Sequence, residues 1–310
     1  MARKADPDFA VDADRGSGTA AAKQAQVMGV DVFTERVATR AGLRDLDARM
    51  EAMPGLTRAQ RDRERITPRS QVAELGHPVM LRTLPSPGQV RVALSSRQKK
   101  ARSKTRLAVQ TALPDTQYLA QRDLVSSDER FVALGDALSD HVGDVGELSV
   151  SQAAQVRRVD RSIAAYERGN DRGHVLYANV EMPVSVNASN LEAFVAKRLP
   201  AGTVVAFDRY TGATHQLHEA TARAREVFGS DIAEVPVFEI ATRRGAYLGH
   251  SDSLDDTGHL LPRAMLFQVL GSHRAGFTAP DGASGMRTVI QLRDVTPEPA
   301  KRAPGRGRTR

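Results

Sequence analysis

A change in hydrophobic periodicity near residue 115 limits the possible folds of this chain more than any other feature. From residue 128 to residue 169, apolar side chains recur at helical spacing: Phe131, Leu134 and Leu138, then Val156, Val159, Ile163 and Tyr166. From residue 174 onward they alternate as in strands, in "VLYANV", "TVVAF", "VFEIA", "AMLFQVLG" and "RTVIQLRDV". Irregular loops rather than regular helical crossovers separate these strands. We therefore expect an α+β domain over residues 115–298, with two packed and mainly antiparallel sheets.

The rest of the chain divides by composition into an arm, a linker and a tail. Residues 1–75 are polar or highly charged and predict a mobile, partly helical arm. Within residues 76–114, the turn sequence "PSPG" separates "PVMLRTL" from "QVRVAL" and predicts a hairpin, which a basic linker follows. Residues 299–310 predict a disordered basic tail. We expect residues 1–110 to make few contacts with the C-terminal half, and proteases to cut first within residues 95–106.

Positive charge is concentrated in the linker and the tail. The chain carries a net charge of +7, and the linker sequence "SRQKKARSKTR" places a group of cations close together: Arg97, Lys99, Lys100, Arg102, Lys104 and Arg106. Such clusters attract acidic protein surfaces and nucleic-acid backbones. No aromatic residues are interleaved to stack bases, so a single-strand-binding site is not favoured. We expect the linker and the tail to contact an acidic surface or nucleic acid.

The composition also excludes several classes of protein. The chain contains no Cys, which excludes disulfides, thiolate metal sites and a cysteine nucleophile. No apolar run is long enough to span a membrane, so we expect no membrane partner. The first residues, "MARKADPDFAVDADRG", lack the apolar core of a signal peptide, and we expect no secretion by that route.

Two groups of histidines suggest metal or acid–base chemistry without completing a site. The sequence "HQLHE" places His215 and His218 one helical turn apart beside Glu219, but it supplies no third ligand. His250 and His259 flank an acidic loop that contains Asp252, Asp255 and Asp256. An exposed helix start and a solvated loop are the favoured interpretations, and we expect no metal site.

The motifs of the C-terminal half follow a characteristic order. "GAYLG", "HLLPRAMLFQVLG" and "VIQLRDV" come after a strand, a capped helix and the sequence "YTGAT". This order, over residues 148–295, resembles the catalytic domain of the mono-ADP-ribosyltransferases of the arginine-serine-glutamate clade, which includes bacterial toxins and phage enzymes. The resemblance implies a split sandwich of two mainly antiparallel sheets with flanking helices, preceded here by the helical and basic arm. It also implies NAD as the cofactor of any enzymatic activity.

Small residues stand at the first two signature positions of that family. The family's arginine, which pairs with the NAD diphosphate, corresponds to Ala178, next to the retained Tyr177. The serine of the second motif corresponds to Gly212 in "YTGAT". The resemblance still implies a weak contact with the cofactor by the residues kept around these positions: Tyr177, Tyr210, Thr211 and Thr214.

The third signature position, the catalytic glutamate of the family, corresponds to Gly258 before "HLLP". Glycine has no side chain that could stabilise the developing oxocarbenium charge. Asp256 stands where the family selects the acceptor residue, and it is the residual candidate for a working carboxylate, with Asp255 as the alternative. Candidates to replace the missing arginine are Arg161, Arg172 and Arg209.

The three losses favour a catalytically inactive protein that uses the scaffold for binding or assembly. We expect protein assembly partners and no bound cofactor. Phage domains of this kind occur fused to head-assembly proteins, and the composition is rich in Arg and Ala and poor in Lys. By analogy we expect a phage head or virion component, such as a minor capsid protein, in the virion or the host cytoplasm. The alternatives are a divergent, active NAD-dependent ADP-ribosyltransferase that modifies a host protein or nucleic acid, and a basic nucleic-acid-associated accessory protein.

Overall fold

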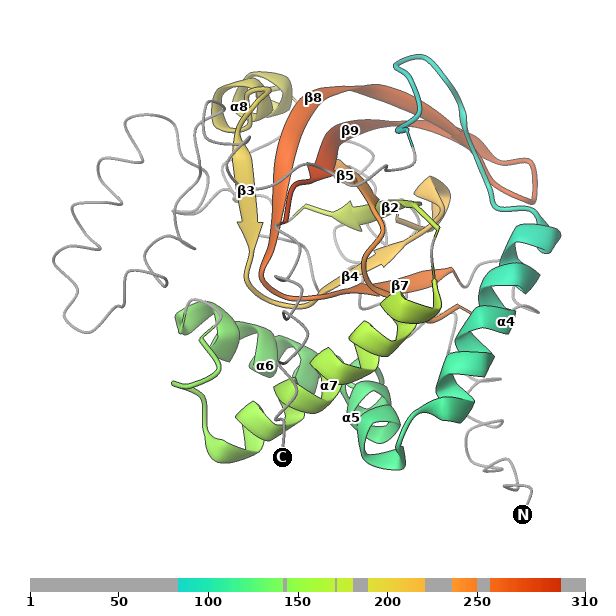
Figure 1. Ribbon diagram of the computed structural model, residues 1–310. Coiled ribbons are helices and arrows are strands. Elements are labelled where there is room, and N and C mark those ends of the chain that lie inside the picture. The colour runs from blue at the N-terminus through green and yellow to red at the C-terminus, as the bar shows by residue number, and fades with distance from the viewer. Residues whose placement is uncertain are drawn as a thin grey trace, which may run out of the picture.

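Along the described part of the chain, the short strand β1 comes first, helices α4 to α7 follow, and the other strands come after them, with α8 between β2 and β3 (Figure 1). The computed structural model describes residues 83–141, 144–170, 172–180, 189–220, 236–249 and 257–296. Its helices are α4 (Ser96–Ala112), α5 (Asp115–Val125), α6 (Asp128–Asp140), α7 (Val150–Gly169) and α8 (Leu191–Arg198). Its strands are β1 (Arg91–Val92), β2 (His174–Asn179), β3 (Val204–Phe207), β4 (Thr211–Thr214), β5 (Val237–Thr242), β6 (Ala246–Tyr247), β7 (Gly258–Leu261), β8 (Met265–Thr278) and β9 (Ser284–Asp294).

The two predicted helical segments form as expected, and their apolar faces are buried. Helix α7 begins at a capping box, in which the Ser149 hydroxyl accepts a hydrogen bond from Gln152 N and the Gln152 side chain accepts one from Ser149 N. Its buried side includes Val156, Val159, Ile163 and Tyr166, and that of α6 includes Phe131, Leu134 and Leu138. Side chains of both helices belong to one apolar cluster, which also contains Tyr210, Ala246 of β6 and Leu260 of β7.

The strands form a single curled sheet, which confirms the α+β class and the mainly antiparallel pairing. Its order is β1-β8-β9-β5-β2-β4-β7-β6, with β3 also paired to β8. Among the strands that the structure describes, only the pairs β1–β8 and β5–β9 are parallel. We predicted two sheets; the structure joins them through one contact between β2 and β4, where Tyr177 lies opposite Thr214. Because β2 also pairs with β5 along its whole length, it belongs to both halves.

The main apolar core lies inside the curl of the sheet, with α8 packed against it (Figure 1). Leu176 and Ala178 of β2, Val205 of β3 and Phe238 of β5 all contribute to this core and are fully buried. The predicted core strands "VLYANV", "TVVAF" and "VFEIA" are therefore confirmed as β2, β3 and β5. Helices α5, α6 and α7 lie on the other side of β4 and β7, so the helices flank one half of the sheet.

The basic stretch predicted as a linker is helix α4, and half of its cations are buried. Ser95 and Gln98 form a capping box at its start. Lys99, Arg102 and Arg106 lie on the buried side, where Arg106 Nη1 donates to Leu248 O at 2.8 Å. The sequence pattern did not predict a docked helix because the buried side of α4 carries cations instead of apolar residues. Long cationic side chains can cover a surface with their aliphatic stems while their charged ends bond to carbonyls.

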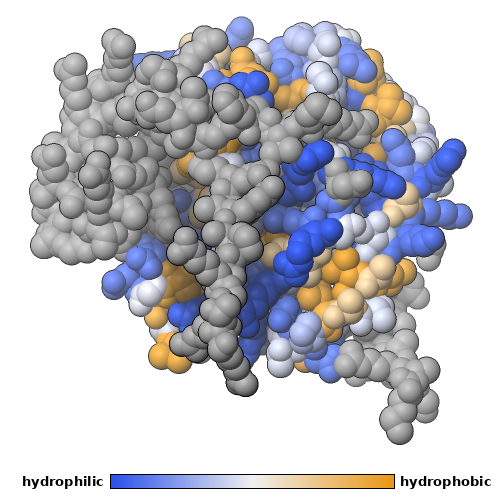
Figure 2. Space-filling view, in the orientation of Figure 1, coloured by the Kyte–Doolittle hydropathy of each residue, from blue (hydrophilic) through white to orange (hydrophobic). Residues whose placement is uncertain are grey.

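The other three cations, Arg97, Lys100 and Lys104, are exposed on the outer side of α4. Hydrophilic side chains accordingly surround the N-terminal end of this helix in Figure 2. The described part of the N-terminal hundred residues therefore contacts the C-terminal half directly, contrary to the expectation of few contacts.

The turn of the predicted hairpin forms at "PSPG", with Gln89 N donating to Ser86 O at 3.1 Å and Gly88 at a φ of +79°. After the turn, β1 pairs with β8 in parallel, Arg91 opposite Phe277. Pairing with a strand before the turn stays a prediction. Most of "PVMLRTL" lies outside the described residues, as do the predicted arm, residues 1–75, and the tail, residues 299–310. None of the described helices is both long and apolar enough to cross a membrane.

The packing of α4 reverses the expected pattern of proteolysis. We now expect trypsin at limiting concentration to leave the Arg97–Arg106 stretch intact while it cuts elsewhere, because hydrolysis of a helical, docked segment requires local unfolding. Mass spectrometry of the first fragments checks this. Early cleavage after Lys99, Arg102 or Arg106 would show that α4 is not docked in solution.

Candidate functional site

The three segments singled out by the resemblance lie side by side in the structure. Tyr177 of β2 is paired with Thr214 of β4, and Thr214 is paired with Gly258 of β7. Gly212 is paired with Leu260 in the same ladder. Sequence reasoning therefore identified neighbouring strands, although the motifs are separated by more than thirty residues each.

The signature positions themselves carry no polar side chain into this region. The Ala178 side chain is fully buried in the core inside the curl, so a longer charged side chain at this position would enter apolar surroundings. Gly212 and Gly258 lie in paired, buried strands. Asp255 and Asp256, the candidate substitutes for the glutamate, lie outside the described residues, as do Asp252 and His250.

Tyr177 and Tyr210, which we expected to line one cleft, belong to different apolar clusters. The Tyr210 hydroxyl donates to Asp160 Oδ1 at 2.6 Å, and Arg263 donates to the same carboxylate, with Nη2 at 2.7 Å from Oδ2. Tyr210 is therefore fastened to α7 and is 2% exposed. The two rings lie apart because Tyr177 is opposite Thr214, at the end of β4, whereas Tyr210 precedes the start of that strand.

The two remaining candidates for cofactor contact, Thr211 and Thr214, are also buried. Thr214 has a defined partner, the carboxylate of Glu219. Glu219 Oε2 accepts hydrogen bonds from the hydroxyls of Thr214 and Thr257, the latter at 2.7 Å, and Oε1 accepts one from Gln216 Nε2. A carboxylate that accepts several hydrogen bonds is stabilised in its charged form. The structure therefore holds a buried carboxylate directly beside the residue pair Thr214–Gly258.

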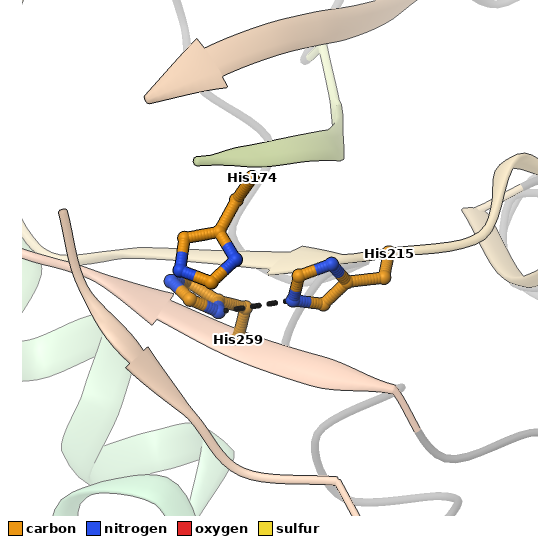
Figure 3. Close-up of side chains that lie close together, drawn as sticks. All are labelled: His174, His215 and His259. Atoms are coloured by element: carbon orange, nitrogen blue, oxygen red, sulfur yellow. Dashed lines mark hydrogen bonds between the residues drawn. The ribbon is translucent and has the colours of Figure 1, made fainter. Parts of the chain in front are cut away.

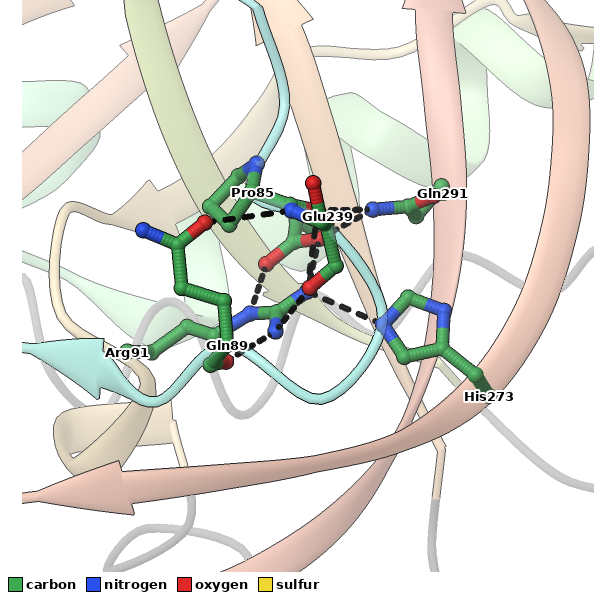
Figure 4. A network of polar contacts seen from close by, with 7 residues as sticks. Pro85, Gln89, Arg91, Glu239, His273 and Gln291 are labelled. Atoms are coloured by element: carbon green, nitrogen blue, oxygen red, sulfur yellow. Dashed lines mark hydrogen bonds and ion pairs between the residues drawn. The ribbon is translucent and has the colours of Figure 1, made fainter.

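A second buried carboxylate, Glu239 of β5, is neutralised by Arg91 of β1 (Figure 4). Arg91 Nε lies 2.8 Å from Glu239 Oε2, and Arg91 Nη2 lies 2.8 Å from Oε1, which is the bidentate geometry favoured for a guanidinium and a carboxylate. The side chains are 2% and 0% exposed. Tyr177 adjoins this pair, and burial, followed by the charge of Glu239, raises the pKa of its phenol well above the usual value.

Further polar groups enclose the ion pair. Gln291 Nε2 donates to Glu239 Oε1 and to Pro85 O, at 2.8 Å each. Arg91 Nη2 lies 2.9 Å from His273 Nε2, and because the guanidinium can only donate, this ring nitrogen accepts. Burial, followed by the positive charge of Arg91, lowers the pKa of His273. In Figure 4 the segment that carries Pro85 and Arg91 lies across the strands that carry Glu239 and Gln291.

The N-terminal segment is also fastened at a second point. Leu94 N donates to Gln216 Oε1 at 2.8 Å, so the segment reaches from the Glu239 network to the Glu219 network. Both buried carboxylates beside the motif strands are thus connected to the described residues 85–94. Sequence reasoning missed Arg91 and Glu239, and it named Glu219 only beside the histidines of "HQLHE". The signal available for the first two was a single charge inside an apolar strand, in "QVRVAL" and "VFEIA".

The proposed substitutes for the family arginine are dispersed. Arg161 is exposed on α7, and Arg209 lies 3.8 Å from Asp136 of α6. Arg172 is exposed and borders a cavity of about 20 Å³ that is also lined by Arg102, Arg106 and His174. The six basic residues predicted to bind an acidic partner divide between the two sides of α4 as described above.

No family model and no curated protein matches the chain. Solved structures do show similarity. The enzymatic component C2-I of the Clostridium botulinum C2 toxin, at pH 6.1, has a TM-score of 0.49 at 10% identity, covering 70% of this chain and 55% of that chain. An ADP-ribosyltransferase from Clostridium botulinum, in a triclinic crystal form, has a TM-score of 0.46 at 13% identity, covering 69% and 99%. Plx2a, an ADP-ribosyltransferase toxin from Paenibacillus larvae, has a TM-score of 0.46 at 11% identity, covering 66% and 99%.

Two of these three proteins are named ADP-ribosyltransferases, the superfamily that the sequence motifs resemble. The chain spans about half the length of the C2-I chains that it matches. At such identities and TM-scores, the similarity leaves the activity of this chain undetermined.

The ion pair makes a strong prediction about stability. Arg91→Ala leaves the Glu239 carboxylate buried without its countercharge, so we expect the free energy of unfolding to fall by about 3–5 kcal/mol. The double variant Arg91→Met, Glu239→Gln should recover most of this loss. Denaturant titration followed by circular dichroism measures both.

The matched control is Arg274→Ala, which removes an exposed arginine from the neighbouring strand β8. It should change the free energy of unfolding by no more than about 0.5 kcal/mol. A loss below about 1 kcal/mol for Arg91→Ala would mean that the two charges are solvated and do not hold the segment in place.

Proposed function

We propose that this chain is a catalytically inactive protein on an ADP-ribosyltransferase-like scaffold, used for binding or assembly. The motif order supports the scaffold, and residues Ala178, Gly212 and Gly258 support the loss of activity. In the family that the motifs resemble, these positions hold the phosphate-binding arginine, a supporting serine and the catalytic glutamate. Side chains of alanine and glycine can neither pair with a phosphate nor stabilise a cationic transition state.

The observation that carries this proposal is that the remaining charged groups form ion pairs and hydrogen bonds with one another. Arg91 is the guanidinium beside the Tyr177 face of β2, and its bidentate bonds go to Glu239. A diphosphate could bind Arg91 only if this buried pair were broken, which would leave the Glu239 carboxylate unpaired in the interior. We therefore assign the segment that carries Arg91 a structural role and no role in phosphate binding.

One observation favours the alternative of a divergent, active transferase. The Glu219 carboxylate lies against Thr214 and Thr257, next to the glycine that stands in the catalytic position. In that case Glu219, or Asp256 in the loop before β7, would supply the negative charge that stabilises the oxocarbenium ion, and NAD would be the cofactor. Glu219 is 3% exposed, which opposes this role because the carboxylate must touch the sugar.

Binding is proposed through the outer side of α4. Arg97, Lys100 and Lys104 follow a spacing of three and then four residues, so their side chains share one helix face. All three are exposed. This basic stripe suits a polyanionic neighbour, as expected for a component of a phage head close to packaged DNA; the virion assignment rests on the family analogy.

The purified protein should show no NAD hydrolysis and no ADP-ribose transfer. Loss of one charge-stabilising group costs about 10²–10³ in rate, and here three groups are replaced together. Effects of groups that act as a unit do not add, but binding and chemistry should both suffer. The assay incubates labelled NAD with the protein, alone and with a bacterial lysate.

Variants at both carboxylates distinguish the possible outcomes. Transfer abolished by Glu219→Gln or by Asp256→Ala, but unaffected by the exposed control Asp281→Ala, would overturn the proposal and identify the working carboxylate. Transfer that survives all three variants would also overturn it and place the site among other residues.

Neutralising the basic stripe should weaken binding to a polyanion. We expect the variant Arg97→Gln, Lys100→Gln, Lys104→Gln to bind random-sequence duplex DNA less tightly, with the slope of log K against log salt reduced by about 0.9 per lost phosphate contact. The control removes the same charge from exposed positions of α7: Arg157→Gln, Arg158→Gln, Arg161→Gln. Equal losses in both variants, measured by fluorescence anisotropy, would exclude a localised site on α4.

A further inference from the structure

Three histidines that are far apart in the sequence meet in the interior near β2, β4 and β7 (Figure 3). His174 begins β2, His215 follows β4, and His259 lies in β7. All three side chains are buried, and one nitrogen of each ring lies within 4.8 Å of one nitrogen of each of the others. The rings are tilted or edge-on to one another, with interplanar angles of 55° to 76°, rather than stacked. In Figure 3 a nitrogen of each ring accordingly faces the space between them.

The spacing of these nitrogens is close to that of a metal site. His215 Nε2 and His259 Nδ1 are 3.2 Å apart. Two imidazole nitrogens on a tetrahedral Zn²⁺, each at about 2.05 Å from the ion, would be about 3.3 Å apart. The third ring would have to approach by no more than about 1.5 Å to complete this geometry, which is within the range of small side-chain rotations.

We propose that His174, His215 and His259 form a binding site for one divalent transition metal ion of the Zn²⁺ class. Imidazole nitrogen is a preferred ligand of Zn²⁺, and three histidines with an open fourth position are a known arrangement for it. In the metal-free protein, His215 Nε2 donates a hydrogen bond to His259 Nδ1. When the ion binds, the neutral His215 ring carries its proton on Nδ1 instead, so that both facing nitrogens offer lone pairs to the ion. The inference stands apart from the proposed function, because none of its ligands is a signature residue.

The surroundings of His259 hold its ring in the form that a metal requires. Its Nε2 lies 3.0 Å from Arg244 O, which can only accept, so Nε2 carries the proton and Nδ1 presents a lone pair. The carbonyl is itself positioned, because Gly245 N donates to Glu167 Oε1 at 2.9 Å. Burial lowers the pKa of His259 to about 4, so the ring is neutral at physiological pH.

Gly245 allows this close approach. Its φ is +101°, and a Cβ at this position would lie 2.5 Å from His259 Nε2 and 2.6 Å from Leu260 O. Only glycine adopts this backbone conformation beside the ring without strain. The backbone conformation of the turn between β5 and β6 therefore leaves room for the His259 ring.

His174 supplies the third ligand through Nδ1, since Nε2 lies 2.7 Å from the Asn170 side-chain amide. In the metal-free arrangement the Asn170 amide nitrogen contacts His174 Nε2 and donates to Arg172 O, while its oxygen accepts from Arg172 N. Coordination through Nδ1 requires the proton on Nε2 and the amide turned by 180°, which gives up the two 3.3 Å bonds to Arg172. The same histidine borders the cavity of about 20 Å³, which is large enough for one water molecule. Of the three histidines only His174 borders this cavity, and a water molecule in it would reach the ion from that side as the fourth ligand.

The charge around the site sets its affinity. Arg102 and Arg106 line the cavity, and the charge of Arg102 opposes a positive charge on His259. The same charge opposes a bound cation, so we expect weaker binding than in cysteine-rich structural sites. A metal-bound water ionises more readily than free water, and the arginines favour the resulting hydroxide over neutral water.

The test measures metal uptake by the full chain, purified without a polyhistidine tag and stripped with EDTA. We expect one equivalent of Zn²⁺ after equilibrium dialysis, and intense visible absorption of a four-coordinate complex when Co²⁺ replaces it. At free Zn²⁺ about 100-fold above Kd, the Tm should rise by roughly 5–10 °C. Uptake of less than one tenth of an equivalent would overturn the proposal.

Variants then locate the ion. His174→Ala and His215→Ala should weaken binding at least tenfold, whereas His218→Ala, one helical turn from His215, should leave it unchanged. Equal loss in His218→Ala would overturn the proposed ligand set. If the ligand variants fail to fold, imidazole NMR of the unaltered chain decides: Zn²⁺ should shift the resonances of three of the eight histidines, and any other number overturns the assignment.

Discussion

The buried pair of Arg91 and Glu239 is the interaction on which the N-terminal part of the structure depends. A carboxylate in the middle of β5 can be buried only with a countercharge, and a short strand before α4 supplies it. This pairing places residues 85–94 across the sheet and brings the start of α4 to its edge. Further along the helix, Arg106 Nη1 donates a hydrogen bond to Leu248 O. The segment before α4 and the middle of α4 are therefore both held against the sheet domain.

The same pairing also determines what chemistry is left to the region. Charged groups do lie beside the motif strands, but each is committed to a structural partner: Arg91 to Glu239, Arg263 to Asp160, and Glu219 to two threonines. Catalysis of ADP-ribose transfer needs such groups to face a ligand. Charged groups that pair with one another inside the domain do not face a ligand, and this is the physical basis for proposing a binding or assembly role.

Strand β2 contributes one residue to each of three regions: the histidine cluster, the surroundings of the buried ion pair, and the apolar core. His174 at its start contributes to the histidine cluster, Tyr177 adjoins the ion pair, and Ala178 faces the apolar core. The strand pairs along its length with β5 but meets β4 at one residue only. The opening beyond this single contact is where the side chains of His174, His215 and His259 come together.

The sequence by itself determined the α+β class, the faces of α6 and α7, and the strands β2, β3 and β5, because hydrophobic periodicity reports directly on local structure. The resemblance also assigns Ala178, Gly212 and Gly258 to the signature positions, which stays a prediction. The tertiary structure alone decided that "SRQKKARSKTR" is a docked helix, that Tyr177 and Tyr210 diverge, and that His174 joins His215 and His259. These features depend on partners 40 or more residues away, for which a sequence pattern contains no local signal. A cation that will be buried cannot be distinguished in the sequence from an exposed one, because its countercharge or carbonyl partner is not known.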